Sequence, residues 1–91
     1  MRFIMTYSWR PTAQQREEGI ARFRKGLGQP GTGAKLIGRW TRADLSGGFE
    51  LFESNDVKAL ADFALKWNDL MELSLTPVLD DAELGEVFSR K

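Results

Sequence analysis

The sequence has 91 residues, of which 42% are apolar and 29% charged, and this excludes a disordered chain because disorder needs low hydrophobicity with high net charge. Thirteen basic residues balance thirteen acidic ones, so no overall field attracts nucleic acid or a membrane surface, and we expect neither as a partner. Cysteine and histidine are both absent, which excludes disulfides, thiolate nucleophiles and most zinc and iron sites, so we expect no metal and no cofactor.

The length fits a single domain over residues 1–91. The start, MRFIMTYSWRP, has an apolar part that is too short and too polar for a signal peptide. No run approaches the roughly 18 apolar residues that a membrane span needs. We therefore expect a cytoplasmic chain.

Residues 2–9 predict the first β-strand, because large apolar side chains recur at every second position. These side chains are Phe3, Met5, Tyr7 and Trp9. A helix is predicted to open at Pro11 and Thr12, since proline is tolerated in a first helical turn. Its apolar stripe consists of Ile20, Phe23 and Leu27. The glycines between residues 26 and 33 end this helix.

Two further strands are predicted over 34–43 and 48–54, and the loop between them at 44–47 has the Asp and Gly residues of a hairpin. Capping oxygens at 54–56 predict the start of a second helix, which ends near Asn68. The apolar stripe of this helix consists of Val57, Leu60, Ala61, Ala64 and Trp67.

Alternation returns over 71–79 and predicts a fourth strand, after which Asp80 and Glu83 have the spacing of a capping box at the start of a short terminal helix. The order β-α-β-β-α-β predicts a ferredoxin-like α+β fold. We expect one antiparallel four-stranded sheet with both main helices on one face.

The strand pattern divides the sheet residues between two faces. In a simple hairpin around 44–47, residues whose numbers sum to 91 lie opposite each other, as Trp40 and Leu51 do. The predicted core face holds Phe3, Met5, Tyr7, Leu36, Trp40, Phe49, Leu51, Met71, Leu73 and Leu75. The other face, which we call the open face, is predicted to hold Ile4, Thr6, Ser8, Ile37, Arg39, Thr41, Glu50, Phe52, Glu72, Ser74 and Thr76.

Apolar residues on the open face predict that a partner covers it. Ile4, Ile37 and Phe52 would each contribute roughly 1.5 to 3 kcal/mol on full burial. A second copy is the simplest partner, so we expect a homodimer that associates through the open face. Pro77 lacks an amide donor and places the fourth strand at a sheet edge, from which it can reach a second subunit.

Four segments in order carry a family resemblance, and they cover most of the chain: FIMTYSW, LIGRW, GFELFESND and WNDLMELSLTPVLDD. The chain resembles the dimeric α/β-barrel (ferredoxin-like) superfamily, and within it a short bacterial family of unknown function. The resemblance implies the fold and a dimeric barrel but no reaction. Relatives often have a histidine just after the tryptophan of the second strand, where this chain has Thr41.

The open face also supplies the candidate site, because a small-molecule site is typically apolar with a few polar groups. The candidate ligand-binding residues are Thr6, Ser8, Arg39, Thr41, Glu50, Phe52, Glu72, Ser74 and Thr76. Glu50 and Glu72 fit a carboxylate pair for proton transfer. We favour the alternative, a cross-strand ion pair between Arg39 and Glu50 at the dimer seam, and we assign no catalytic residue.

Three functions remain open at the level of sequence. The first is a homodimer that binds a small organic molecule between its two sheets, or that serves only in association. The second, which rests on the superfamily resemblance, is a cofactor-independent monooxygenase or isomerase acting on an aromatic or lactone substrate. In that case Arg39 would stabilise an anion, Glu50 or Glu72 would move a proton, and Thr6 and Thr76 would orient the ligand. The third is an interaction domain for a different protein.

Overall fold

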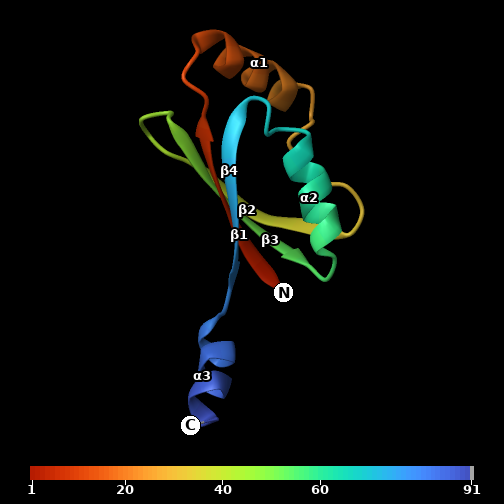
Figure 1. Cartoon of the computed structure of the whole chain (residues 1–91), viewed down its shortest axis with the longest axis vertical. Coiled ribbons are helices and arrows are strands. Elements are labelled where there is room, and N and C mark those ends of the chain that lie inside the picture. The colour runs from red at the N-terminus through yellow and green to blue at the C-terminus, as the bar shows by residue number, and fades with distance from the viewer. Residues whose placement is uncertain (91) are drawn as a thin grey trace.

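Residues 1–90 are described by a computed structural model of the chain. Their elements are β1 (Arg2–Trp9), α1 (Ala13–Arg24), β2 (Ala34–Thr41), β3 (Gly47–Ser54), α2 (Val57–Leu65), β4 (Met71–Val78) and α3 (Asp81–Ser89). All paired strands are antiparallel, and they form one sheet in the order β2-β3-β1-β4 (Figure 1). The predicted element order and the α+β class are therefore confirmed.

Helix α1 begins after Thr12, whose side-chain oxygen accepts a hydrogen bond from the amide of Gln15 at 3.2 Å. It ends at Arg24, and Gly26 follows in the left-handed region with φ of 82°. Leu27, which we expected in the apolar stripe, therefore lies beyond the helix, because glycine at position 26 readily takes the conformation that ends one.

Helix α2 begins after the N-cap Asp56 and ends at Leu65, before the predicted end near Asn68. Trp67 lies in the turns that follow and is nevertheless buried. Helix α3 has the predicted capping box: the carboxylate of Asp80 accepts from the amide of Glu83 at 2.8 Å, and the carboxylate of Glu83 accepts from the amide of Asp80 at 3.1 Å.

The β2–β3 hairpin departs from the expected register by two residues, because Trp40 lies opposite Phe49 and not opposite Leu51. The loop closes where the amide of Arg42 donates to the carbonyl of Gly47 at 2.8 Å. Further from the loop, the register shifts again between Leu36 and Gly38, as at a β-bulge.

A shift of two residues leaves the faces of the hairpin strands unchanged, but the pairing of β3 with β1 corrects the predicted faces. Phe52 lies opposite Phe3 and therefore points towards the helices with it, so from Gly48 onward the even-numbered residues of β3 are the buried ones. The residues wrongly placed on the open face are Arg39, Thr41, Glu50 and Phe52. The residues wrongly placed in the core are Trp40, Phe49 and Leu51, and Trp40 is 57% exposed.

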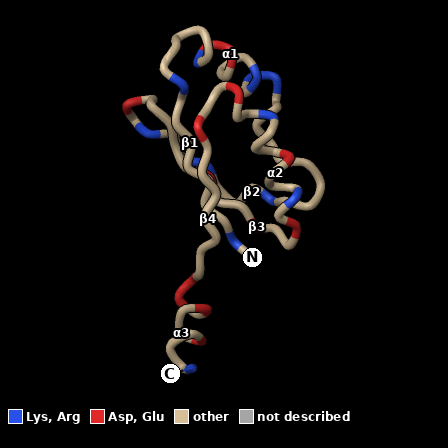
Figure 2. The backbone as a smooth tube through the Cα atoms, viewed as in Figure 1, with Lys and Arg blue, Asp and Glu red and all other residues tan. Residues whose placement is uncertain are grey.

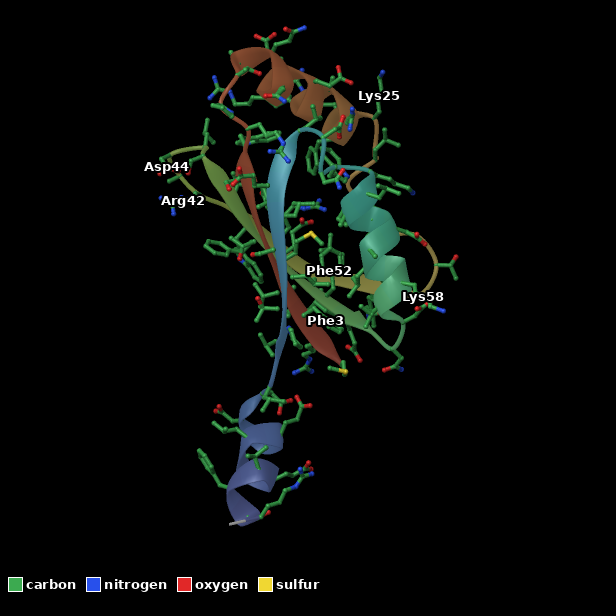
Figure 3. All side chains as sticks on the ribbon, in the orientation of Figure 1. Phe3, Lys25, Arg42, Asp44, Phe52 and Lys58 are labelled. Carbon is green, nitrogen blue, oxygen red and sulfur yellow. The ribbon has the colours of Figure 1, made fainter. Side chains whose placement is uncertain are left out.

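The core lies between the sheet and α2. Phe52, Met5 and Leu60 are its largest fully buried side chains. The rings of Phe52 and Phe63 meet edge to face with centroids 5.5 Å apart. Figure 3 shows Phe52 on the side of the sheet that faces α2.

The other two helices lie at opposite ends of the molecule (Figure 1). α1 crosses the end of the sheet where β1 finishes and β4 begins, and α3 projects from the other end. We expected the apolar stripes of both main helices to cover the core, but in α1 only Gly19 is buried, whereas Ile20 and Phe23 are 43% and 54% exposed. The space between α1 and the sheet is therefore only partly filled.

Candidate functional site

A cavity of about 350 Å³ lies between α1 and the helix-facing side of the sheet. Its walls are mainly apolar and aromatic: the sheet contributes Met5, Tyr7 and Leu73, α1 contributes Ile20 and Phe23, and Phe63 and Trp67 close one side. This size and composition are typical of a small-molecule site, which is usually apolar with a few fixed polar groups. We call this space the α1 cavity.

Polar contacts beside the cavity join α1 to the segment between α2 and β4. Arg22 forms a two-point ion pair with Asp69, with nitrogen–oxygen distances of 3.0 and 2.8 Å, and donates to the carbonyl of Lys66 at 2.9 Å. The hydrogen bonds from Arg22 hold the pKa of Asp69 below its usual range. Gln15 adds a bond to the carbonyl of Asp69 at 3.3 Å. These contacts fix α1 to the segment between α2 and β4.

Gly19 brings α1 close to the end of β1. A Cβ atom at this position would overlap the ring of Trp9, so the helix approaches that ring directly through its backbone. Trp9 also lines the cavity. The close approach at Gly19 and the ion pair at Arg22 together set the height of the α1 cavity.

An ion pair between Arg39 and Glu50 lies in the cavity wall. The Nε and Nη2 atoms of Arg39 donate to one oxygen of Glu50, Oε2, at 2.8 and 2.6 Å, and Nη2 also donates to the carbonyl of Gly28. The guanidinium stacks on the ring of Phe23, 5.3 Å from its centroid. Arg39 is thus held on three sides.

The carboxyl group of Glu50 is the most buried charged group of the site, with a side chain 7% exposed. Burial raises the pKa of Glu50 above its usual range, and the hydrogen bonds from Arg39 oppose that shift without cancelling it. A buried carboxyl group with a raised pKa, beside an apolar cavity, is a candidate for accepting a proton from a bound molecule and returning it.

Tyr7 and Thr41 form the second polar contact in the wall, with 3.2 Å between their oxygens. Either hydroxyl can donate, so the pair can rotate to offer one donor or one acceptor to a bound molecule.

The structure divides the predicted site residues between the two faces of the sheet. Arg39, Thr41 and Glu50 line the α1 cavity, and Phe52 lies in the core. The other predicted residues remain on the open face, where β1 and β4 pair. Thr6 lies opposite Ser74, Ser8 lies opposite Glu72, and Thr76 lies opposite Ile4. The ion pair between Arg39 and Glu50 that we favoured is present, but it lies on the helix-facing side of the sheet and not at the dimer seam where we expected it. Glu50 and Glu72 are therefore on opposite faces of the sheet and cannot act as a pair.

Sequence reasoning missed the contribution of α1 to the site. Arg16, Ile20, Phe23 and Arg24 line the cavity and have the spacing i, i+4, i+7 and i+8, which places them on one helix face. The sequence predicts the apolar members of this face to be core residues. The two arginines flanking them were the available signal that the face borders a polar opening.

Among residues 1–90, no group of three or more Asp and Glu side chains is arranged to hold a metal ion. No helix within this part of the chain has the length and apolar character needed to cross a membrane.

The chain belongs to a protein family described as Domain of unknown function (DUF3303), whose model matches residues 1–91. Among solved structures, the chain is similar to that titled Structure of Rv0793 from Mycobacterium tuberculosis, with a TM-score of 0.56 and 12% sequence identity. The alignment covers 90% of this chain and 99% of that chain. At this identity the likeness supports the fold alone. No curated protein matches the sequence.

Proposed function

We propose that this protein is a ferredoxin-like homodimer that binds a small organic molecule in the α1 cavity. The observation that carries the proposal is an apolar cavity of about 350 Å³ with the buried Arg39–Glu50 pair in its wall. Cavities lined by apolar side chains and left unfilled cost stability, because the lining atoms lose their packing contacts. A bound molecule would recover those contacts.

The fixed geometry of the cavity wall favours a role in binding a small molecule over a role in subunit association alone. Arg39 is fixed by Glu50, by the carbonyl of Gly28 and by the ring of Phe23, so its geometry exists before a ligand arrives. Preorganised groups of this kind give orientation at little entropic cost. The hydroxyls of Tyr7 and Thr41 add an adjustable donor and acceptor.

The homodimer is supported by the apolar side chains left on the open face. Trp40, Phe49 and Ile37 are 57%, 42% and 45% exposed, and Ile4 and Leu51 lie directly opposite each other beside them. Exposed apolar groups gathered in this way usually mark an interface. A second open face placed against the first would cover them and complete a dimeric barrel.

The exposed apolar face of helix α3 also supports the proposal of a homodimer. None of its residues is buried, and its exposed apolar side chains Leu84, Val87 and Phe88 recur at the spacing of one helix face. A nine-residue helix is marginal in water without packing partners. Because α3 projects beyond the sheet (Figure 1), another subunit is the natural surface for this face.

Cavity binding is tested with a matched pair of tryptophan substitutions. Ile20→Trp adds a large side chain to the cavity wall, whereas Leu65→Trp adds one to an exposed position of α2 outside it. With 2-naphthoate as the probe in titration calorimetry, we expect Ile20→Trp to weaken binding by about tenfold or more and Leu65→Trp to leave it unchanged. Equal affinities for both variants would contradict the proposed site.

A cofactor-independent enzyme, the monooxygenase or isomerase considered above, is the second candidate, and the raised pKa of Glu50 favours it. Glu50 would remove a proton next to a carbonyl, and Arg39 would stabilise the enolate that forms. A suitable probe is α-angelica lactone, a β,γ-unsaturated butenolide, in D₂O. Deuterium incorporation followed by NMR should disappear in Glu50→Gln and persist in Glu72→Gln, which alters the open face. Incorporation equal to that of buffer alone would exclude proton transfer on this substrate class.

A further inference from the structure

The charges around the α1 cavity do not balance. Its charged lining residues are Arg16, Arg24, Arg39 and Glu50. Arg39 and Glu50 neutralise each other within the wall. Neither Arg16 nor Arg24 forms an ion pair with any residue of the described part of the chain. The cavity therefore has two positive charges without a partner at its helical side.

These two arginines lie at the opening, while the apolar groups lie between and beneath them. Arg16 and Arg24 are exposed residues of α1, and Ile20 lies between them on the same helix face. A shallower polar hollow adjoins the cavity and shares Trp9, Arg16 and Leu45 with it. Arg16 thus stands where the apolar cavity meets solvent, which is the position from which a guanidinium can meet the charged end of a partly enclosed molecule.

The two other arginines near α1 are already engaged in ion pairs. Lys25, the C-cap of the helix, is in none of the ion pairs of the described residues, but unlike Arg16 and Arg24 it does not line the cavity. Arg22 is paired with Glu18 and Asp69 on the outer side of the helix. Arg10 donates to the carbonyl of Asn68 at 2.9 Å and lies 3.8 Å from Glu72. Ordinary ion pairing at the surface thus accounts for Arg10 and Arg22. It does not account for the two arginines at the cavity opening.

From this arrangement we infer that the ligand of the α1 cavity is an organic carboxylate with a flat apolar body. The body lies among Phe23, Phe63 and Trp67, and the carboxylate lies at the opening between Arg16 and Arg24. The inference rests on the proposed function and adds the chemical class of the ligand. A cavity of about 150 Å³ is enough to hold benzene, so about 350 Å³ accommodates two fused rings.

The test compares 2-naphthoate with 2-naphthamide, which has the same shape and no charge, by titration calorimetry at neutral pH. The wild-type protein should bind the carboxylate about tenfold more tightly or better, since hydrogen bonds to charged groups are the stronger ones. The variant Arg16→Gln/Arg24→Gln should bind the two compounds equally. The control Lys58→Gln/Lys66→Gln removes the same charge from α2 and its C-cap, where Lys58 points away from the sheet (Figure 3), and should keep the preference.

Each outcome bears on one of the two claims. Binding of both compounds with no preference, or a preference that survives in Arg16→Gln/Arg24→Gln, would overturn the carboxylate inference and leave the cavity as a binding site. A preference lost equally in Lys58→Gln/Lys66→Gln would also overturn it, because a general charge effect would then suffice. No binding of either compound to the wild type would overturn the proposed function and this inference together.

Discussion

The ion pair of Glu50 with Arg39 shows how burial and pairing act in opposite directions on the pKa of one carboxyl group. Removing two opposite charges from water costs free energy, and their attraction offsets this only where the geometry is good. Here Arg39 donates two bonds to one oxygen of Glu50, yet burial still raises the pKa of the carboxyl group. The protein therefore holds Glu50 closer to its protonated form than an exposed glutamate.

This environment predicts a pH-dependent stability. Because the folded-state pKa of Glu50 is raised, its contribution to stability is present below the ordinary glutamate pKa of about 4.3 and is lost as the pH rises through the raised value. Relative to Glu50→Gln, the wild type should lose free energy of unfolding as the pH rises above about 4. Urea titrations at several pH values measure the difference, with Glu72→Gln as control. A difference that stays constant with pH would contradict this expectation.

The ion pair itself was predictable from sequence, whereas its place was not. Neighbouring strands put Arg39 near Glu50 in any plausible register of the hairpin. Which face they share depends on whether odd or even residues of β3 point inward. Both choices would bury an apolar side chain, because the odd-numbered positions hold Phe49 and Leu51 and an even-numbered one holds Phe52. The observed choice also buries Glu50, against the usual preference of glutamate for water.

At the scale of elements, Gly19 determines how closely α1 approaches the sheet. Alanine is favoured over glycine within a helix by about 1 kcal/mol, so propensity alone predicts that Gly19→Ala stabilises the protein. The added Cβ would overlap the Trp9 ring, however. Crowding of this kind costs about 1 to 3 kcal/mol, so the net effect should be destabilising.

Gly85 in α3 provides the matched comparison, because a Cβ there meets no atom within 4 Å. Thermal unfolding followed by circular dichroism should show a lower midpoint for Gly19→Ala and an unchanged or higher midpoint for Gly85→Ala. If both variants gain stability, α1 does not rest on Trp9 in the way described here.

The elements themselves follow from the sequence more closely than their packing does. The caps at Thr12, Asp56 and Asp80 and the strand alternation locate all seven elements, because these signals act over a few residues. The hairpin register depends on the loop closing at Arg42 and on a bulge near Ile37, and neither has a distinct sequence pattern. The α1 cavity depends on how far a helix stands from a sheet, which periodicity does not encode.

At the scale of the whole molecule, the two ends carry different charge, as Figure 2 shows. The α3 end has a run of acidic residues, whereas both signs are interspersed around α1. The long axis of 51 Å reflects the projection of α3 from the sheet. A chain with one half-covered sheet and one unsupported helix has apolar surface that a second copy can bury.

The dimer predicts a mass of twice 10.3 kDa in sedimentation equilibrium at micromolar concentration. Phe49→Asp places a carboxylate in the centre of the open face, and burying an unpaired charge costs several kcal/mol. The dissociation constant should therefore rise by about 100-fold or more. Leu65→Asp makes the same kind of change at an exposed position of α2 and should leave the mass unchanged. A monomeric wild type would contradict the dimer.

The three tryptophans give the most direct test of the central claim, that the ligand lies in the α1 cavity. Trp9 and Trp67 line the cavity, whereas Trp40 lies on the open face. Their indole N–H signals can be followed in ¹⁵N-labelled protein during titration with 2-naphthoate. We predict that the signals of Trp9 and Trp67 shift and that of Trp40 does not. A shift of Trp40 alone would place the ligand between the two sheets and contradict the account.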